Sequence, residues 1–153
     1  VDVAAVVVTY NSADHVSALL DSIPSAMGSL SYSIVVVDNG SSDQTAELLE
    51  SRTDCVVVRS TTDGYAAGMN RAVKAGEEAD AVLILNPDAT LDADAVPAMM
   101  RVLGKPGVGS VAPLDGVSVT VTCSPAAGPK PEPLSFSSVT VKVCAPPSAA
   151  VNV

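Results

Sequence analysis

The sequence has little positive charge. Eight lysine and arginine residues stand against seventeen acidic residues, which gives a formal net charge of −9. Affinity for nucleic acid rests largely on cationic side chains that displace counterions from phosphates, so we predict no nucleic-acid partner. An anionic ligand of such an acidic protein needs a local device, such as a metal ion or backbone N–H groups, to offset the surrounding field.

Long apolar runs and cysteine motifs for metal binding are also missing. Hydrophobic residues make up 48% of the chain, yet the run at residues 3–8 is far shorter than the ~20 residues that cross a bilayer. We expect no transmembrane segment and no secretion signal. Three cysteines without CxxC spacing and one histidine, His15, argue against a structural zinc site and favour a reducing cytosol.

Short apolar runs alternate with stretches of helical period in the first three quarters of the chain. The runs lie at residues 3–8, 33–37, 55–59, 81–85 and 108–112. Near-continuous apolar runs of this length are typical of strands covered on both faces. The alternation predicts an α/β fold: a mostly parallel, Rossmann-like sheet with right-handed crossovers and helices on both faces.

Three features predict where helices lie. Four apolar residues recur at i, i+3, i+4 and i+7 and so share one helix face: Val16, Leu19, Leu20 and Ile23. Ser41 and Gln44 have capping-box spacing, which predicts a helix start there. Asp94 is a candidate N-cap of a later helix, in which Pro97 is tolerable because it would lie in the first turn.

The composition changes at Gly116. Sixteen of the seventeen acidic residues precede this point, whereas six of the eleven prolines follow it. Segments of period two at residues 117–123 and 138–144 favour two strands that could pair as a hairpin; partial disorder is the alternative. We therefore divide the chain into a domain at residues 1–115 and a Pro/Val/Ser-rich tail at residues 116–153.

Polar clusters follow four of the predicted strands. They are Thr9-Tyr10-Asn11, the stretch from Asp38 and Asn39 to Asp43, Gly64-Tyr65, and Asn86-Pro87-Asp88. Ligands of open parallel sheets bind outside the carboxyl ends of the strands. Four polar clusters at one sheet edge therefore predict a binding site.

Each cluster taken alone also has an ordinary structural explanation. Asp38 could accept hydrogen bonds from a base or ribose, or it could simply satisfy backbone donors in a strand-to-helix turn. The glycines of DGYAAGMNRA, Gly64 and Gly68, do not form GxGxxG and could serve helix packing or ligand approach. Arg71 could meet a phosphate or be merely solvated. His15 is expected to be a partly exposed helical residue.

The segment Asn86-Pro87-Asp88 in LILNPDAT (residues 83–90) can form an ordinary turn or can bind a metal ion. Pro87 blocks further strand pairing and fixes φ near −65°, so Asp88 leaves the sheet at a defined angle. A carboxylate held in this way suits Mg²⁺ or Mn²⁺, which commonly take one or two protein carboxylates together with water and substrate phosphates. An isolated Pro-Asp turn would be the simpler interpretation.

Together these motifs resemble the family 2 glycosyltransferases with the GT-A fold. VVVTYNS (residues 6–12), VVVDNGSSD (35–43), GYAAGMN (64–70) and LILNPDA (83–89) match the successive donor-site motifs of that family in order. The NPD form looks most like the bacterial branch that contains rhamnosyltransferases of cell-wall and O-antigen assembly. The resemblance covers residues 3–113.

The resemblance implies roles for individual residues. Thr9, Tyr10 and Asn11 would line the nucleotide pocket, and Asp38, followed by Asn39, would contact the base or ribose. A further set would lie along the nucleotide-sugar site: Gly64, Tyr65, Asn70 and Asn86. Asp88 stands in the place of the DXD motif and would bind Mg²⁺ or Mn²⁺.

The resemblance also implies an inverting, metal-dependent transfer from a dTDP- or UDP-sugar donor to a saccharide or lipid-linked acceptor of the cell wall or a polysaccharide. Such a protein would be cytoplasmic or peripheral at the inner face of the cell membrane. The oligomeric state is left open. After Asp115 the chain has a single acidic residue, Glu132, in a Pro-rich context, so no residue matches the family's catalytic base except Glu132 as a remote candidate.

Two alternatives remain beside an active transferase. The missing base favours a catalytically silent nucleotide-binding or structural remnant, with a tail that arises from truncation, a shifted reading frame or divergence. A flavodoxin-like or receiver module is the third alternative. It is disfavoured because no lysine follows a late strand as a receiver would require.

Overall fold

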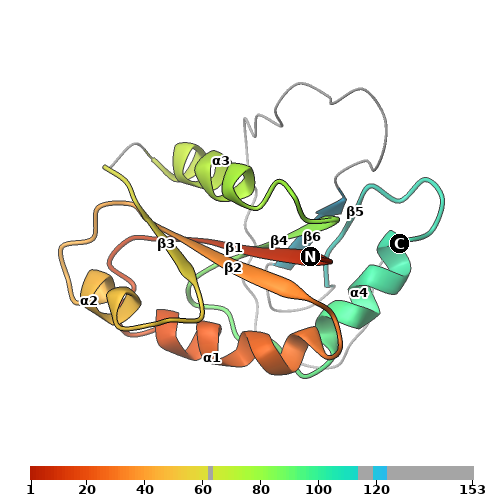
Figure 1. The fold of residues 1–153 in the computed structure, drawn as a ribbon, viewed down its shortest axis with the longest axis horizontal. Coiled ribbons are helices and arrows are strands. Elements are labelled where there is room, and N and C mark those ends of the chain that lie inside the picture. The colour runs from red at the N-terminus through yellow and green to blue at the C-terminus, as the bar shows by residue number, and fades with distance from the viewer. Residues whose placement is uncertain (62–63, 114–118, 124–153) are drawn as a thin grey trace.

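The computed structural model describes residues 1–61, 64–113 and 119–123. Within them the chain forms one sheet of six strands in the order β3-β2-β1-β4-β6-β5 (Figure 1). The strands are β1 (Val3–Thr9), β2 (Tyr32–Asp38), β3 (Val56–Arg59), β4 (Ala81–Leu85), β5 (Ser110–Val111) and β6 (Val119–Cys123). The helices are α1 (Val16–Met27), α2 (Thr45–Glu50), α3 (Tyr65–Ala75) and α4 (Ala95–Leu103). The predicted α/β class is confirmed.

The first four strands are parallel, as the alternation of apolar runs and helical stretches predicted. β1 pairs in parallel with both β2 and β4, and β2 pairs in parallel with β3. Every residue of β1 and of β4 is buried, which explains why these strands read as continuous apolar runs.

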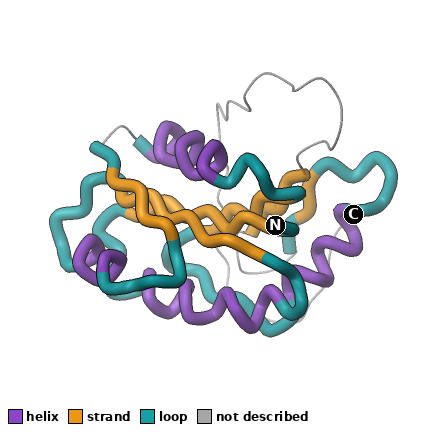
Figure 2. The backbone as a smooth tube through the Cα atoms, viewed as in Figure 1, coloured by secondary structure: helices purple, strands orange, loops and turns teal. Residues whose placement is uncertain are grey.

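Helices cover both faces of the sheet. α1, α2 and α4 lie on one face and α3 lies on the other (Figure 2). Alternate residues of β1 supply the two cores: Val7 faces the three helices, whereas Val6 and Val8 face α3. The four residues predicted to share one face of α1 are all fully buried, so that prediction is confirmed.

The end of the sheet differs from a simple parallel array. β6 lies between β4 and β5 and is antiparallel to both. The first period-two segment of the tail is thus a strand of the main sheet, and the run at residues 108–112 contributes only the short β5. The second segment, and with it the hairpin alternative, lies outside the described residues, so the division at residue 115 stays a prediction.

The predicted helix after β2 is present as α2, but the capping box predicted at its start is not. The helix begins at Thr45, and Gln44 at its N-cap position makes no side-chain capping bond. The Ser41 hydroxyl instead donates to Asp38 at 2.5 Å, because a strand-end carboxylate three residues earlier competes for it. At the start of α4 Asp94 occupies the N-cap position, as predicted, but also without a side-chain capping bond.

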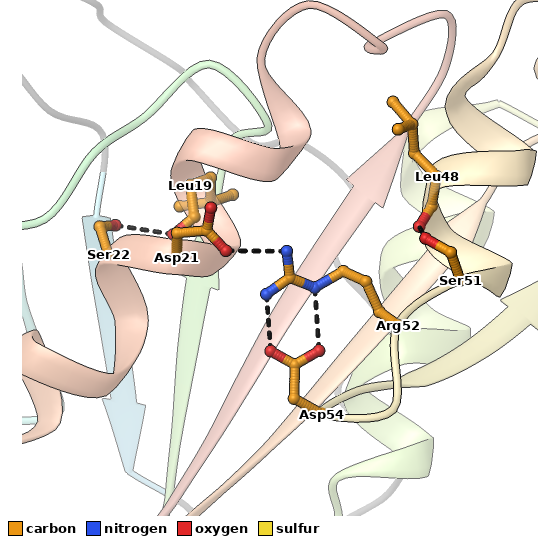
Figure 3. Close-up of polar contacts among 7 residues, drawn as sticks. All are labelled: Leu19, Asp21, Ser22, Leu48, Ser51, Arg52 and Asp54. Carbon is orange, nitrogen blue, oxygen red and sulfur yellow. Dashed lines mark hydrogen bonds and ion pairs between the residues drawn. The ribbon is translucent and has the colours of Figure 1, made fainter.

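An arginine clamp ties α1 to the loop that precedes β3. Arg52 donates to both carboxylate oxygens of Asp54, at 2.9 and 2.6 Å, and to Asp21 of α1 at 2.8 Å (Figure 3). The bidentate geometry aligns the loop, although partly exposed ion pairs contribute only about 0–1 kcal/mol each. Among the described residues, no helix combines the length and apolar character needed to span a membrane.

Candidate functional site

The parallel register brings the predicted polar clusters to one edge of the sheet. Thr9 at the end of β1 is paired with Asp38 at the end of β2, and Val7 of β1 is paired with Leu85 at the end of β4. In the sheet, β2 lies on one side of β1, whereas β4 lies on the other side of β1. Such a point, where connections diverge, opens a crevice at the carboxyl ends of the strands.

Asp38 is held in one orientation by Ser41. The carboxylate is only 2% exposed, and its Oδ1 accepts the Ser41 hydroxyl at 2.5 Å and the Ser41 N–H at 3.2 Å. Its second oxygen, Oδ2, has no hydrogen-bond partner in the described part of the chain. Asp38 therefore satisfies a local backbone donor through Oδ1, as the ordinary structural explanation of this turn expects.

The loops that follow β1 and β2 are joined into one unit. Asn11 adopts a left-handed conformation with φ of 48°, donates its N–H to Ser41 Oγ at 3.0 Å, and accepts the Ser42 N–H at 2.8 Å. Ser12 donates its N–H to Thr45 Oγ1 at 2.8 Å. These contacts span about thirty residues of sequence. The site floor is thus fixed before any ligand arrives.

Two predicted residues of the first loop take contrasting positions. Thr9 is fully buried and its hydroxyl donates to the Val37 carbonyl at 3.4 Å, so its side chain lies beneath the site. Tyr10 is 53% exposed, a large fraction for an aromatic residue. Its ring is therefore accessible to a planar ligand at the sheet edge.

Two buried polar atoms near this edge lack a partner in the described structure. One is Oδ1 of Asn39, a residue only 6% exposed, and the other is the hydroxyl oxygen of Tyr65. Burial raises the pKa of the Tyr65 hydroxyl, which stays a neutral donor. A buried polar atom without a partner costs about 1–3 kcal/mol, so such atoms mark places where a ligand or an ordered water completes the bonding.

The start of α3 combines an open turn with tight helix packing. Gly64 has φ of 86°, and a Cβ at this position would meet no atom within 4 Å, so backbone conformation rather than space requires glycine there. A Cβ on Gly68 would lie 3.0 Å from Val8 Cγ1, which supports the packing explanation for this glycine. Asn70 is exposed, and Arg71 donates to the Ser60 hydroxyl at the end of β3.

The NPD segment forms a turn that presents Asp88 to solvent. The Ala89 N–H donates to the Asn86 carbonyl at 3.1 Å and closes the turn around Pro87. Asn86 is half-buried, Ala89 is buried in the core on the α1 face, and Asp88 between them is exposed. The carboxylate therefore projects from an anchored backbone.

The residues at this edge fit a divalent cation that arrives with its ligand. In the described ranges no group of three or more His, Cys, Asp or Glu residues could hold a metal by itself. Mg²⁺ and Mn²⁺ commonly use one or two protein carboxylates and complete their shell with water and phosphate oxygens. Asp88 is an exposed carboxylate at this edge. Glu132, the remote candidate for a base, lies outside the described residues.

Asp43 gives the joined loops a dependence on pH. Hydrogen bonding from the Thr45 side chain, opposed by burial and aided by the N–H groups of Thr45 and Ala13, holds the pKa of Asp43 below its ordinary value of 3.8. A depressed carboxyl pKa stabilises the fold above the unfolded value, and this stability is lost as the pH falls through the folded value.

We predict that Asp43→Asn unfolds more readily at neutral pH and loses less stability than the wild type as the pH falls below 3.8. The N–H groups of Ala13 and Thr45 donate to different oxygens of the Asp43 carboxylate. An amide has an acceptor oxygen at only one of these two places, so one of the two hydrogen bonds is lost. Urea unfolding at a series of pH values measures both effects. Parallel stability curves for the two proteins would contradict the assigned role of the carboxylate.

Sequence reasoning missed the serine and threonine side chains that join the loops. Across the gap between two strand ends, Ser41 Oγ accepts the Asn11 N–H, Thr45 Oγ1 accepts the Ser12 N–H, and Ser42 Oγ donates to Asn11 Oδ1. A weak signal existed in the serine-rich run that follows Asp38. Ser22 of α1 accepts the Leu91 N–H at 3.1 Å. Nothing in the local sequence indicates that contact.

The fold and the arrangement of these residues agree with a family-level match. The model of the family "Glycosyl transferase family 2" matches residues 4–120, and the chain belongs to this family. The resemblance drawn from the four motifs is thereby confirmed at the level of the family. No curated protein matches the chain by sequence.

Solved structures of glycosyltransferases share the fold. S. aureus TarS 1–349 in complex with UDP-GlcNAc is 25% identical, with a TM-score of 0.55 over 67% of this chain and 31% of that chain. The mannosyltransferase PcManGT from Pyrobaculum calidifontis, in complex with GDP-Man and Mn²⁺, is 22% identical, with a TM-score of 0.68 over 80% of this chain and 44% of that chain.

A third similar structure is glucosyl-3-phosphoglycerate synthase from Mycobacterium tuberculosis in complex with UDP. It is 20% identical, with a TM-score of 0.58 over 72% of this chain and 43% of that chain. The chain thus spans less than half the length of each of these three proteins. The shared part is a GT-A-type α/β fold.

Proposed function

We propose that the chain binds a nucleotide-diphosphate sugar, a dTDP- or UDP-sugar, as the donor part of an inverting glycosyltransferase that acts on a saccharide or lipid-linked acceptor. One observation carries the proposal. In a chain of glycosyltransferase family 2, a buried carboxylate with a free oxygen, a buried amide with an unpaired oxygen and an exposed carboxylate follow the strands at one sheet edge.

The nucleoside is placed by Asp38, Asn39 and Tyr10. Asn39 Oδ1 is a buried acceptor without a partner, and Asp38 offers Oδ2 as a further acceptor, because Ser41 bonds to Oδ1. The N–H of uracil or thymine and the hydroxyls of a ribose are donors for these oxygens. The exposed ring of Tyr10 offers an apolar surface for the base. Gly64, Tyr65 and Asn70 at the start of α3 and Asn86 after β4 border the donor site.

Asp88 holds Mg²⁺ or Mn²⁺ together with the diphosphate. The cation neutralises charge that develops on the leaving nucleoside diphosphate. In a protein with a net charge of −9 it also offsets the field that would otherwise repel the diphosphate. The complex of PcManGT with GDP-Man and Mn²⁺ supports a divalent cation in proteins of this fold.

On the acceptor side, the proposed substrate is a saccharide or lipid-linked acceptor of the cell wall or a polysaccharide. Inverting transfer needs a base to deprotonate the acceptor hydroxyl, and the chain offers only Glu132 after residue 115. The NPD form favours the rhamnosyltransferase-like branch of cell-wall assembly, cytoplasmic or peripheral at the inner membrane face. The absence of a residue that matches the family's base motivates the second candidate, a nucleotide-binding domain without turnover.

Calorimetric titration of UDP and dTDP, each with Mn²⁺ and with EDTA, tests the proposal. We expect at least one nucleotide to bind at least tenfold more tightly with Mn²⁺, because the cation links Asp88 to the diphosphate. Absence of binding by both nucleotides would contradict it. Incubation with the corresponding nucleotide sugar and a saccharide acceptor then separates the two candidates, since tight binding without release of nucleotide favours the silent one.

A further inference from the structure

Ser22 connects α1 to the loop that carries Asp88. Its hydroxyl donates to the Leu19 carbonyl at 2.7 Å, one turn back in the helix (Figure 3), and accepts the Leu91 N–H at 3.1 Å. Donation to Leu19 fixes the rotation of the O–H group, which leaves its lone pairs for Leu91. One side chain of α1 thereby holds a backbone atom 69 residues further along the chain.

The loop between β4 and α4 depends on few other contacts of this kind. Its start is closed by the turn bond between Ala89 and Asn86, and its end by the bond from the Asp94 N–H to the Ser25 carbonyl at 3.0 Å. Between these points, within the described structure, Ser22 supplies the side-chain hydrogen bond to the loop backbone. Leu91, the residue held by Ser22, lies three residues after Asp88.

We propose that Ser22 is a positioning residue for Asp88: it fixes the loop so that the carboxylate meets a divalent cation and a nucleoside diphosphate in one geometry. The inference rests on the proposed function. Asp88 is exposed and is a single carboxylate, so the affinity of the site depends on how well its backbone is held. Supporting groups behind a metal ligand typically change metal affinity by about tenfold or more.

The chain contains a matched control for the hydroxyl. Ser51, near the end of α2, donates to the Leu48 carbonyl at 2.7 Å, with the same spacing along the chain and the same distance as Ser22 to Leu19 (Figure 3). Within the described chain, Ser51 Oγ accepts no hydrogen bond from another segment. Substitution of either serine by alanine therefore removes a hydrogen bond to the preceding helical turn. Only the substitution of Ser22 also removes the hydrogen bond to the loop.

The experiment compares Ser22→Ala, Ser22→Thr and Ser51→Ala with the wild type. UDP is titrated with Mn²⁺ and with EDTA, and hydrogen exchange of the Leu91 amide is measured without ligand. We expect Ser22→Ala to weaken binding in Mn²⁺ by about tenfold, to change binding in EDTA by less than about twofold, and to speed the Leu91 exchange. Ser22→Thr, which keeps the hydroxyl, restores both readouts, and Ser51→Ala matches the wild type.

Two results overturn the inference while the proposed function stands. In one, Ser22→Ala and Ser51→Ala have the same affinity for UDP in Mn²⁺. In the other, Ser22→Ala loses affinity equally in Mn²⁺ and in EDTA, which is the signature of a general structural role. A wild type whose UDP binding does not respond to Mn²⁺ instead overturns the metal assignment in the proposed function. Should Ser22→Ala fold poorly, failure of Ser22→Thr to preserve slow Leu91 exchange rejects the contact.

Discussion

Asp88→Asn is expected to remove most of the metal-dependent part of nucleotide binding. The carboxylate is exposed at the tip of the turn closed by Asn86 and Ala89, and the substitution keeps its shape while removing its charge. A neutral amide is a poor ligand for Mg²⁺ or Mn²⁺, so UDP affinity in Mn²⁺ should fall by roughly 10- to 100-fold, which corresponds to about 1.4–2.7 kcal/mol. Affinity in EDTA should not change.

The control for Asp88→Asn is Asp92→Asn. Asp92 is also an exposed carboxylate, four residues further along the same loop. Its substitution makes the same change in net charge, so it reports any general effect of the field on the diphosphate. A less negative field favours the diphosphate, so an effect of the field on it would be a gain in affinity. Equal losses in the two variants would instead show a general attraction of the cation to the carboxylates of this loop and would remove Asp88 from the metal site. A change in the EDTA titration of Asp88→Asn would point to a direct contact with the nucleotide.

The sheet edge that carries these residues could be predicted from the sequence because its causes are local. Strands buried on both faces must be almost wholly apolar, so β1 and β4 stand out as runs, and burial ends at the residues that follow them, exposed Tyr10 and half-buried Asn86. Parallel order follows from the intervening helices. The convergence of the clusters is then a consequence of topology, which the register of β1 with β2 and β4 confirms.

Contacts between distant segments could not be predicted in the same way. Ser41 has capping-box spacing with Gln44, yet the nearer carboxylate of Asp38 takes its hydroxyl. The period of residues 117–123 indicates a strand but not its partner, and β6 pairs with β4. Local patterns determine which backbone groups need partners, and only the packed structure determines which partner is nearest.

Asn39→Leu is expected to have opposite effects on folding and on binding. In the free protein Asn39 Oδ1 is buried without a partner, and an apolar side chain of similar size removes that cost. The free energy of unfolding should therefore rise by about 1 kcal/mol. UDP binding should weaken by roughly tenfold, since the acceptor that we assign to the base or ribose is lost. Urea unfolding without ligand and calorimetric titration of UDP measure the two effects.

Thr9→Val is the matched control, because Thr9 is also buried but its hydroxyl already has a partner in the Val37 carbonyl. Removal of that hydroxyl deletes a buried hydrogen bond, so this variant should lose stability rather than gain it. A gain in stability with loss of UDP affinity is the pattern of a residue retained for binding at a cost to folding. If Asn39→Leu instead loses stability as Thr9→Val does and still binds UDP normally, Asn39 is part of the scaffold and the assigned contact with the nucleoside is wrong.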